Sequence, residues 1–453
     1  MATRLGIAAD LASLVALPIL TIVRVRASLP NFGRCRSDVP GGRDLHFRRG
    51  FDCPVLPDTI HAPISLRSRR PFGRRNCSFR SGANPRQMKT DSNERNVSAE
   101  LFPFPEGWYF VARRETIEKE KLLQKTWLGE RIVVWSNDNG DVCVAVATCP
   151  HMGSDLGPEA GGRVRDGCLV CPFHGFEFDA SGQCVATPYA PAPRSARLKV
   201  FETRDILGLI FAWWSSSGRP PQWDLPEAPP AGSDWCGMEF WSVRFSGHPQ
   251  ETTENSVDLG HLRFVHGYNS VSGVEPVSVD GAWLKSCFDF KRTQTVAGIK
   301  VFAYDVSAVT HVHGFGYSYV EVREHNIGMD TRLWVLATPI DGDLVEMTLV
   351  SQVRQLLGPK RPIVGMRFLP PRLRTRIMNK IIMAAQKHDV LQDVAIWGRK
   401  RYRPRPMLCA SDGPIGQYRR YCKQFYPDGQ FCNSRAQDRL SVGTEHRPDP
   451  RTR

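Results

Sequence analysis

Two cysteines and two histidines lie close together in the chain, in an order that could bind metal. Cys149 and His151 form the first pair, Cys171 and His174 form the second, and nineteen residues separate the pairs. Thiolate sulfur and imidazole nitrogen are ligands suited to iron or zinc. A proline follows each cysteine and glycines are frequent. We therefore expect two rigid loop tips whose backbone N–H groups face the metal-bound sulfurs.

The order of these ligands separates two kinds of metal site. A Rieske [2Fe–2S] centre holds one iron by two cysteines and the other iron by two histidines, so each pair must send its cysteine and its histidine to different irons. Zinc ribbons and fingers usually place like ligands together, as C-x-x-C or H-x-x-x-H. The alternation of Cys and His favours the iron–sulfur cluster, and a structural zinc knuckle is the alternative.

A second set of ligand-type residues begins 80 positions after His174. Its members are Glu254, Asn255, Asp258, His261 and His266. Two histidines and a distant carboxylate form the face that holds non-haem Fe(II) and leaves positions open for O2. His261 and His266 are five apart, which is not one face of a regular helix, so a widened turn or a helix end must bring them together.

The third iron ligand is expected far along the chain. The stretch 387–400 reads as a helix, and Asp389 and Asp393 lie on one face of it with i,i+4 spacing. From spacing alone, either carboxylate could reach the metal. The neighbouring His388 is interpreted as structural or exposed.

Short strands are predicted around the first ligand set. Residues 107–112, 131–137 and 141–148 are rich in β-branched and aromatic side chains, and a hairpin is expected at 198–215. Asp-Asn-Gly at 138–140 is a hairpin turn signal. The pattern predicts a small all-β domain with the ligands on loops.

The chain after this domain predicts a mixed α and β region. A Pro-, Gly- and Ser-rich stretch at 216–236 reads as a linker. Apolar and polar residues alternate through 283–357, which indicates antiparallel strands. Helices are expected at 250–266 and 364–400, and a pocket between helix and sheet. Three histidines on the strands are expected in a pocket wall or at the surface: His311, His313 and His325.

From Phe104 to Tyr426 the chain resembles the oxygenase component of the Rieske non-haem iron oxygenases. The family pattern Asn-x-x-(x)-Asp-x-x-His-x-x-x-x-His is matched by Asn255, Asp258, His261 and His266. The pattern Gln-Asp-x-x-Ile-Trp is matched by Gln392, Asp393, Ile396 and Trp397. The resemblance implies an α+β fold: an all-β Rieske domain at 101–215, the linker at 216–236, and a catalytic domain at 237–428 in which a helix covers an antiparallel sheet (helix-grip, START-like).

The resemblance also implies roles for the ligand-type residues. It implies that Cys149, His151, Cys171 and His174 bind a [2Fe–2S] cluster, and that His261, His266 and Asp393 bind a mononuclear iron. It implies head-to-tail homotrimers in which Asp258 carries the electron between a Rieske histidine of one subunit and an iron-ligating histidine of the next. NAD(P)H is used indirectly, through an external ferredoxin or flavin reductase, because no G-x-G-x-x-G stands at a strand-to-helix turn.

The C-terminal segment is similar to the steroid-acting branch of the family, with the 3-ketosteroid 9α-hydroxylases and cholesterol 7-desaturases. The shared features are Asp412-Gly413-Pro414-Ile415 and Gln424-Phe425-Tyr426. One departure is Phe176, where many members have Trp. The resemblance implies hydroxylation or desaturation of a sterol or steroid. The alternatives are a ring-hydroxylating or demethylating oxygenase for another aromatic or polycyclic substrate, and a Rieske electron-transfer protein without oxygenase activity.

The two ends of the chain differ in composition from its body. Residues 1–87 have fifteen Arg, no Lys, no Glu and five Asp, whereas the rest is near charge balance, so the chain has no basic body for nucleic acid. We interpret 1–87 as a dispensable extension or a targeting segment, whose apolar run at 11–23 could associate with a membrane, and 429–453 as a polar tail. The thirteen scattered cysteines show no disulfide framework and favour the cytoplasm.

Overall fold

The computed structural model describes residues 101–427, except 228, 230–231, 297–298, 360–365 and 367. The described residues belong to one compact unit, 96–453. The extension predicted at 1–87 and the tail at 429–453 lie outside the described residues. Within the described part of the chain, no helix has both the length and the apolar character needed to cross a bilayer.

The first region of the unit is built from short strands in three small sheets. Its elements are β1 (Gly107–Arg113), α2 (Arg114–Glu120), β2 (Leu122–Trp127), β3 (Glu130–Ser136), β4 (Val142–Val146), the 3-10 turn η2 (Pro158–Ala160), β5 (Arg163–Arg165), β6 (Cys168–Val170), β7 (Glu177–Phe178), β8 (Cys184–Ala186), β9 (Val200–Phe201), β10 (Thr203–Ile206) and β11 (Leu209–Trp214). The sheet orders are β1-β11-β10, β2-β3-β4-β9 and β5-β6-β7-β8. The all-β prediction is confirmed, although α2 and the strands β2, β5, β6 and β8 were not predicted.

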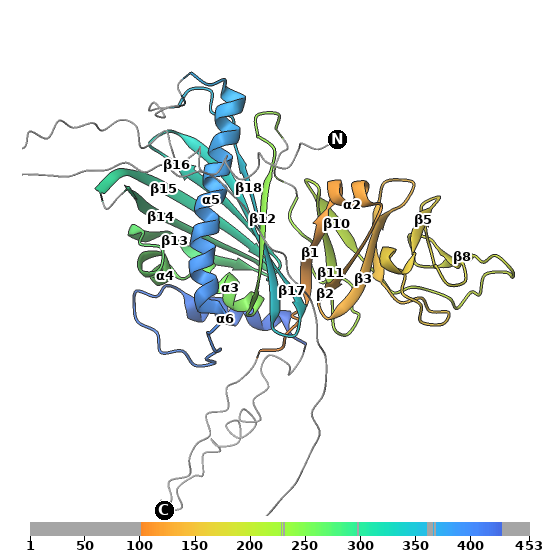
Figure 1. Cartoon of the computed structure of the whole chain (residues 1–453). Helices are drawn as coiled ribbons and strands as arrows, with labels where there is room; N and C mark the ends of the chain where they lie inside the picture. The colour runs from red at the N-terminus through yellow and green to blue at the C-terminus, as the bar shows by residue number, and fades with distance from the viewer. Residues whose placement is uncertain are drawn as a thin grey trace, which may run out of the picture. The chain divides into compact units, whose positions relative to one another are not determined.

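The second region is one antiparallel sheet covered by a long helix (Figure 1). Its elements are β12 (Glu239–Ser246), α3 (Pro249–Thr253), η3 (Glu254–Ser256), α4 (Leu259–Phe264), β13 (Asn269–Asp280), β14 (Trp283–Val296), β15 (Ile299–His313), β16 (Tyr317–Glu324), β17 (Met329–Asp341), β18 (Leu344–Val353), α5 (Pro371–Trp397), α6 (Ile415–Cys422) and η4 (Lys423–Phe425). The seven strands run in the order β12-β18-β17-β16-β15-β14-β13. The α+β fold with a helix over a sheet is confirmed.

Alternating residues of β17 bury the two faces of this sheet. Trp334 and Leu336 pack with Trp108 and Phe211 of the small sheet β1-β11-β10. Val335 and Ala337, at the alternate positions of the strand, pack with residues of α5. Because side chains alternate across a strand, one strand serves both cores. The sheet is thereby held between the all-β region and α5.

Two predicted helices have different bounds in the structure. The helix expected at 250–266 is divided into α3, η3 and α4, because Asp258 has extended backbone and caps α4, with its side chain accepting the His261 N–H. The helix expected at 364–400 is shorter, as α5 begins at Pro371 and ends at Trp397. A proline at the first helical position suits a helix start, and the residue before it is kept out of helical geometry.

Candidate metal centres

The two loops that carry the Cys/His pairs have the same backbone hydrogen bonds. The Cys149 N–H donates to Ser154 O (2.8 Å), and the Gly153 N–H donates to Cys149 O (2.9 Å). In the second loop the Cys171 N–H donates to Phe176 O (2.8 Å), and the N–H four residues on returns to Cys171 O (3.1 Å). The residue at this fourth place is glycine in both loops, with φ of +76° and +69°. Only glycine adopts that conformation without strain, so the glycines set both tips.

The four side chains are sorted by type between the inside and the outside of the tips. Cys149 and Cys171 are each 2% exposed within a hydrophobic core. The rings of His151 and His174 lie 4.8 Å apart, and His151 is exposed. Two buried thiols facing two outer imidazoles fit a cluster whose inner iron takes sulfur and whose outer iron takes nitrogen. This sorting fits a Rieske cluster better than a zinc knuckle.

Phe176, which departs from the family's Trp, contacts a predicted cluster ligand. Its ring stacks on His151 with the ring centroids 4.3 Å apart and an interplanar angle of 10°.

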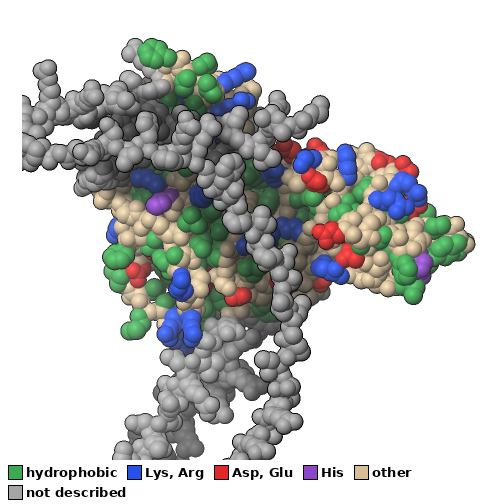
Figure 2. Space-filling model, in the orientation of Figure 1, with side chains coloured by type: hydrophobic (Ala, Val, Ile, Leu, Met, Phe, Trp, Pro, Cys, Tyr) green, Lys and Arg blue, Asp and Glu red, His purple; other side chains and the backbone are tan. Residues whose placement is uncertain are grey.

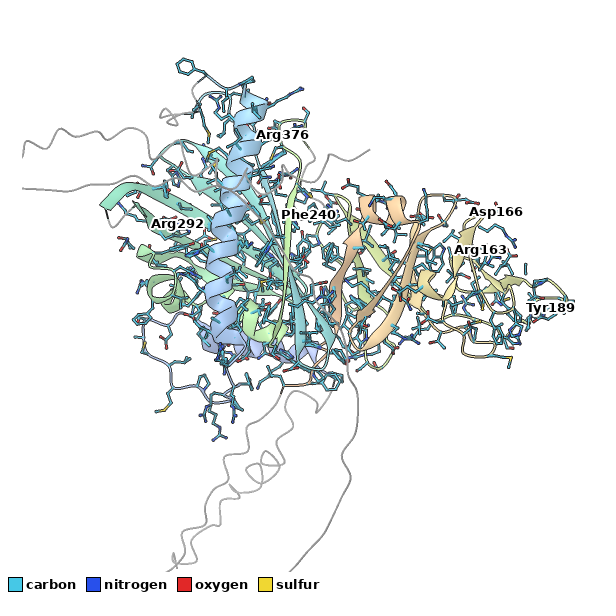
Figure 3. The ribbon with its side chains drawn as sticks, in the orientation of Figure 1. Arg163, Asp166, Tyr189, Phe240, Arg292 and Arg376 are labelled. Atoms are coloured by element: carbon cyan, nitrogen blue, oxygen red, sulfur yellow. The ribbon has the colours of Figure 1, made fainter. Side chains whose placement is uncertain are left out.

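Burial raises the pKa of the Cys149 thiol to about 11, so binding of a cluster must displace the thiol proton. Figure 3 labels Tyr189, which lies at the outer end of this region and is 64% exposed.

Three predicted iron ligands converge beneath the C-terminal half of α5. Ligand atoms of His261, His266 and Asp393 all lie within 4.8 Å of one another. The His266 Nε2 and Asp393 Oδ2 atoms are 3.4 Å apart, and the two imidazole rings are 5.2 Å apart. His261 lies in α4, and His266 follows it in the turn after the helix. The helix end thus brings together two histidines that a regular helix would place on different faces.

Hydrogen bonds to the ring nitrogens orient both imidazoles. His261 Nδ1 lies 2.6 Å from the Asp258 backbone oxygen, and His266 Nδ1 lies 3.0 Å from Gln392 Oε1. Both partners are acceptors, so each Nδ1 carries the proton and each Nε2 keeps its lone pair. Two such imidazoles and one carboxylate suit Fe(II). Gln392 was recognised in the sequence only as part of a motif, and that motif was the available signal for its role.

Burial and the neighbouring carboxylate act in opposite directions on these histidines. Burial lowers the pKa of His261, which favours the neutral ring. Burial would also lower the pKa of His266, but hydrogen bonds to Asp393 and Gln392 raise it overall. The Asp393 carboxylate is therefore held against the His266 ring, and both groups would bind the same metal ion.

Asp389, the other carboxylate of the i,i+4 pair, is already bound to side chains of the protein. Its carboxylate accepts hydrogen bonds from the Tyr268 hydroxyl (2.8 Å) and from the Arg292 guanidinium (3.1 Å). Arg292 lies on β14 and is labelled in Figure 3. The contacts support Asp393 as the ligand, because Asp389 is occupied and Asp393 adjoins His266.

Two further acidic residues of the predicted set, Glu254 and Asp258, are not among the three converging ligands. Glu254 turns away from the histidines and contacts Arg419 (2.7 Å) and Lys400 (3.2 Å). The Asp258 side chain accepts the His261 N–H at 3.1 Å and is 31% exposed. Its predicted role between subunits stays a prediction. Asn255 is half-buried in η3.

Four histidines that the sequence placed on strands or on the long helix do not join the three ligands: His311, His313, His325 and His388. His311 faces Trp283, and His325 contacts Ser307. Burial lowers the pKa of His313 to about 4. His388 is exposed on α5. They lie on the sheet or the helix surface.

The C-terminal motifs support the segment that carries Asp258. Gly413 has φ of +91°, and a Cβ atom there would lie 2.3 Å from Val257 O, so only glycine allows this approach. Tyr426 Oη donates to Gln250 Oε1 (2.7 Å), and the Phe425 carbonyl accepts the Glu106 N–H (2.7 Å). The last motif therefore ties the helix-and-sheet region to the start of the all-β region.

Both regions of the chain match known protein families. Residues 107–202 match the Rieske [2Fe-2S] domain, and residues 212–426 match the 3-ketosteroid 9alpha-hydroxylase C-terminal domain. A cholesterol 7-desaturase of Xenopus laevis is 30% identical over 73% of this chain and 74% of its own length. A 3-ketosteroid-9-alpha-monooxygenase oxygenase component of Rhodococcus rhodochrous is 27% identical over 72% of this chain and 83% of its own length.

Solved structures share the fold at lower identity. Dicamba monooxygenase bound to 3,6-dichlorosalicylic acid has a TM-score of 0.54 at 19% identity and covers 72% of this chain and 98% of its own. NdmA of Pseudomonas putida CBB5 with caffeine, as a QL mutant, has a TM-score of 0.53 at 17% identity, over 70% of this chain and 89% of its own. The family matches and the curated relatives show that the chain belongs to the Rieske non-haem iron oxygenases. It is an oxygenase component, which uses a [2Fe–2S] cluster and a mononuclear iron and receives its electrons from a separate reductase.

Proposed function

We propose that this chain is a terminal oxygenase that hydroxylates or desaturates a sterol or steroid at an iron held by His261, His266 and Asp393. The observation that carries the proposal is the meeting of these three ligand atoms within 4.8 Å beneath α5. The substrate class rests on the relatives, which are named cholesterol 7-desaturase and 3-ketosteroid-9-alpha-monooxygenase.

The protein side chains position and insulate the reaction. When bound, the iron supplies O2-dependent oxidation of a C–H bond, and the cluster supplies electrons one at a time. The Nδ1 protons of His261 and His266 are held on Asp258 O and Gln392 Oε1, which aims both Nε2 lone pairs at one point. The Asp393 carboxylate supplies the charge on the third side. Apolar packing of α5 on the sheet keeps water from the helix face.

Product analysis tests the substrate class. The purified chain, with both metals loaded, would be supplied with a surrogate reductase and given cholesterol, a 3-ketosteroid or an aromatic acid. Oxidation of a sterol or 3-ketosteroid is expected. Turnover of the aromatic acid alone would contradict the proposal, and about three iron atoms per chain distinguish an oxygenase from an electron carrier with two.

We further propose a homotrimer in which Asp258 bridges the cluster of one subunit and the iron of the next. Asp258 is partly exposed beside His261, and His151 is exposed at the cluster tip with Phe173, which is 61% exposed. Each group is therefore available to a neighbouring subunit.

Mixed oligomers test this arrangement. Cys171→Ser subunits should lack the cluster, and Asp393→Ala subunits should lack the iron. Each variant alone should be inactive, whereas co-assembled subunits should regain activity, because an intact cluster then lies beside an intact iron of another subunit. Mixed trimers without activity would contradict the bridge.

We propose domains at 101–215 and 237–428, joined by the linker 216–236. The last strand of the first region ends at Trp214 and the first strand of the second begins at Glu239, which supports these bounds.

None of the described cysteines forms a disulfide, which supports a reducing compartment such as the cytoplasm. A chain that starts at Met88 should be soluble and loaded with its cluster. An insoluble or empty product would contradict a dispensable extension.

A further inference from the structure

Apolar and basic side chains lie side by side where α5 begins. Leu357 is 71% exposed, Phe368 is 93% exposed and Leu373 is 45% exposed. Figure 2 shows hydrophobic and basic atoms together at this end of the molecule, and Figure 3 labels Arg376 there. Exposed apolar groups that cluster in this way mark interaction surfaces. We define the α5 tip by three apolar and three exposed basic residues: Leu357, Phe368, Leu373, Arg372, Arg376 and Lys380.

The opposite side of the same helical turns is pinned to the protein by buried polar groups. Arg374 donates to the Leu356 carbonyl, and Thr375 Oγ1 accepts the Leu356 N–H at 3.0 Å. Asn379 Nδ2 donates to Ser351 O at 3.1 Å. These bonds fix the rotation of α5 about its axis. The tip residues are therefore presented outward on a rigid support.

Charge on the outer face of α5 has one sign. Both acids of the helix, Asp389 and Asp393, are buried, and the exposed charged residues are all cations. The nearby acids Asp234 and Asp330 each form an ion pair with Arg354. Asp234 also lines a hollow with Arg372 and Arg376, and Glu239 and Arg376 act in opposite directions on the pKa of Cys236. The three exposed cations of the tip therefore leave an excess of positive charge around its apolar side chains.

We propose that the α5 tip docks on the surface of an anionic lipid bilayer. Exposed aromatic and aliphatic side chains enter the boundary between headgroups and acyl chains, while arginines and lysines meet anionic headgroups. An acidic protein partner would use the cations but would leave a nearly fully exposed phenylalanine without a role. Arg376 lies about 26 Å along the helix from Asp393 at 1.5 Å per residue, so the tip is separate from the metal centre. The proposal rests on this surface and holds whatever the substrate is.

Vesicle flotation of the metal-loaded full chain tests the proposal. The protein should bind phosphatidylcholine vesicles that contain about 30% phosphatidylserine more tightly than pure phosphatidylcholine vesicles. The combined variant Arg372→Gln, Arg376→Gln and Lys380→Gln should bind on the order of 100-fold more weakly, since each cation near an anionic surface contributes about fivefold. Leu357→Ser with Phe368→Ser should weaken binding to both kinds of vesicle. Cluster absorbance and iron content should match the parent chain, which excludes misfolding.

A matched control lies on the same helix. Leu391 is 42% exposed, close to the value for Leu373, and Lys387 is exposed nearby. Lys387→Gln with Leu391→Ser should leave vesicle binding unchanged. An equal loss in this control would overturn the tip as the docking site.

Hydrogen exchange of the vesicle-bound full chain locates the contact. Protection is expected in peptides that cover 368–380. Protection confined to 1–95 or to 399–408, the second basic stretch, would overturn the proposal. Vesicle binding unchanged by the tip variants, with weaker binding of the reductase, would also overturn it and would assign the tip to a protein partner.

Discussion

The cluster loops and the iron site are built in opposite ways from similar ligands. The four cluster ligands lie within 149–174, and each loop is closed by its own backbone hydrogen bonds and its own glycine. The iron ligands come from α4, from the turn after it and from α5. His261 is held by Asp258 of its own segment, but His266 and Asp393 are held by contacts between the turn and α5. Damage to one centre should therefore leave the other intact, and the iron site should be sensitive to more distant substitutions.

The largest effect is expected from removal of the carboxylate ligand. Asp393→Ala should abolish turnover and bound mononuclear iron, because two imidazoles alone bind Fe(II) weakly. The visible spectrum of the cluster should be unchanged, and iron analysis should fall from about three to about two atoms per chain.

Asp389→Asn is the matched control for this variant. The amide oxygen can still accept the Tyr268 hydroxyl, so the site should keep its iron. Loss of iron from Asp389→Asn, with retention by Asp393→Ala, would reverse the assignment of the two carboxylates.

A smaller effect is expected at Gln392, which has no counterpart in the cluster loops. Gln392→Leu removes the acceptor that holds His266 Nδ1. Loss of such a partner typically weakens metal binding by about 10–100-fold. Competition with a chelator measures this, and Gln392→Glu, which keeps an acceptor oxygen, should retain more iron. Equal iron affinity in the parent chain and Gln392→Leu would contradict the orienting role.

The same difference decides how much could be predicted from the sequence. The order of Cys and His predicts a Rieske cluster from residue types alone, because that centre is local. His261 and His266 were candidates from their residue types, but the choice of Asp393 came from family resemblance, since spacing left Asp389 and Asp393 equivalent. Only the fold shows that Tyr268 and Arg292 occupy Asp389.

Secondary structure follows a similar division. The strands β14–β18 alternate because at least one face is buried, and they were predicted. The edge strand β13 is mostly exposed, so it shows little alternation and was not predicted. The break of the expected helix at 250–266 depends on the capping role of Asp258, which is visible only in the backbone geometry.

A moderate effect on stability is expected from Arg292. Arg292→Gln weakens the link between β14 and α5 by removing a charged partner from buried Asp389. A hydrogen bond to a charged group contributes about 1.5–3 kcal/mol, so the free energy of unfolding should fall by about that amount. Denaturation followed by tryptophan fluorescence measures the loss, with cluster absorbance as the local control. Equal stability of Arg292→Gln and the parent chain would show that the link carries little free energy.

The smallest expected effect is a difference in stability between alanine variants of the two cluster loops. Gly153 and Gly175 both have positive φ, so alanine at either place should cost about 1–2 kcal/mol. A Cβ atom at Gly175 would also lie 2.8 Å from Pro188 Cγ, whereas one at Gly153 would have no atom within 4 Å. Gly175→Ala should therefore lose cluster absorbance at a lower temperature than Gly153→Ala. Equal losses would mean that backbone strain alone sets the cost and that Pro188 yields, whereas a larger loss in Gly153→Ala would contradict the shared geometry of the two tips.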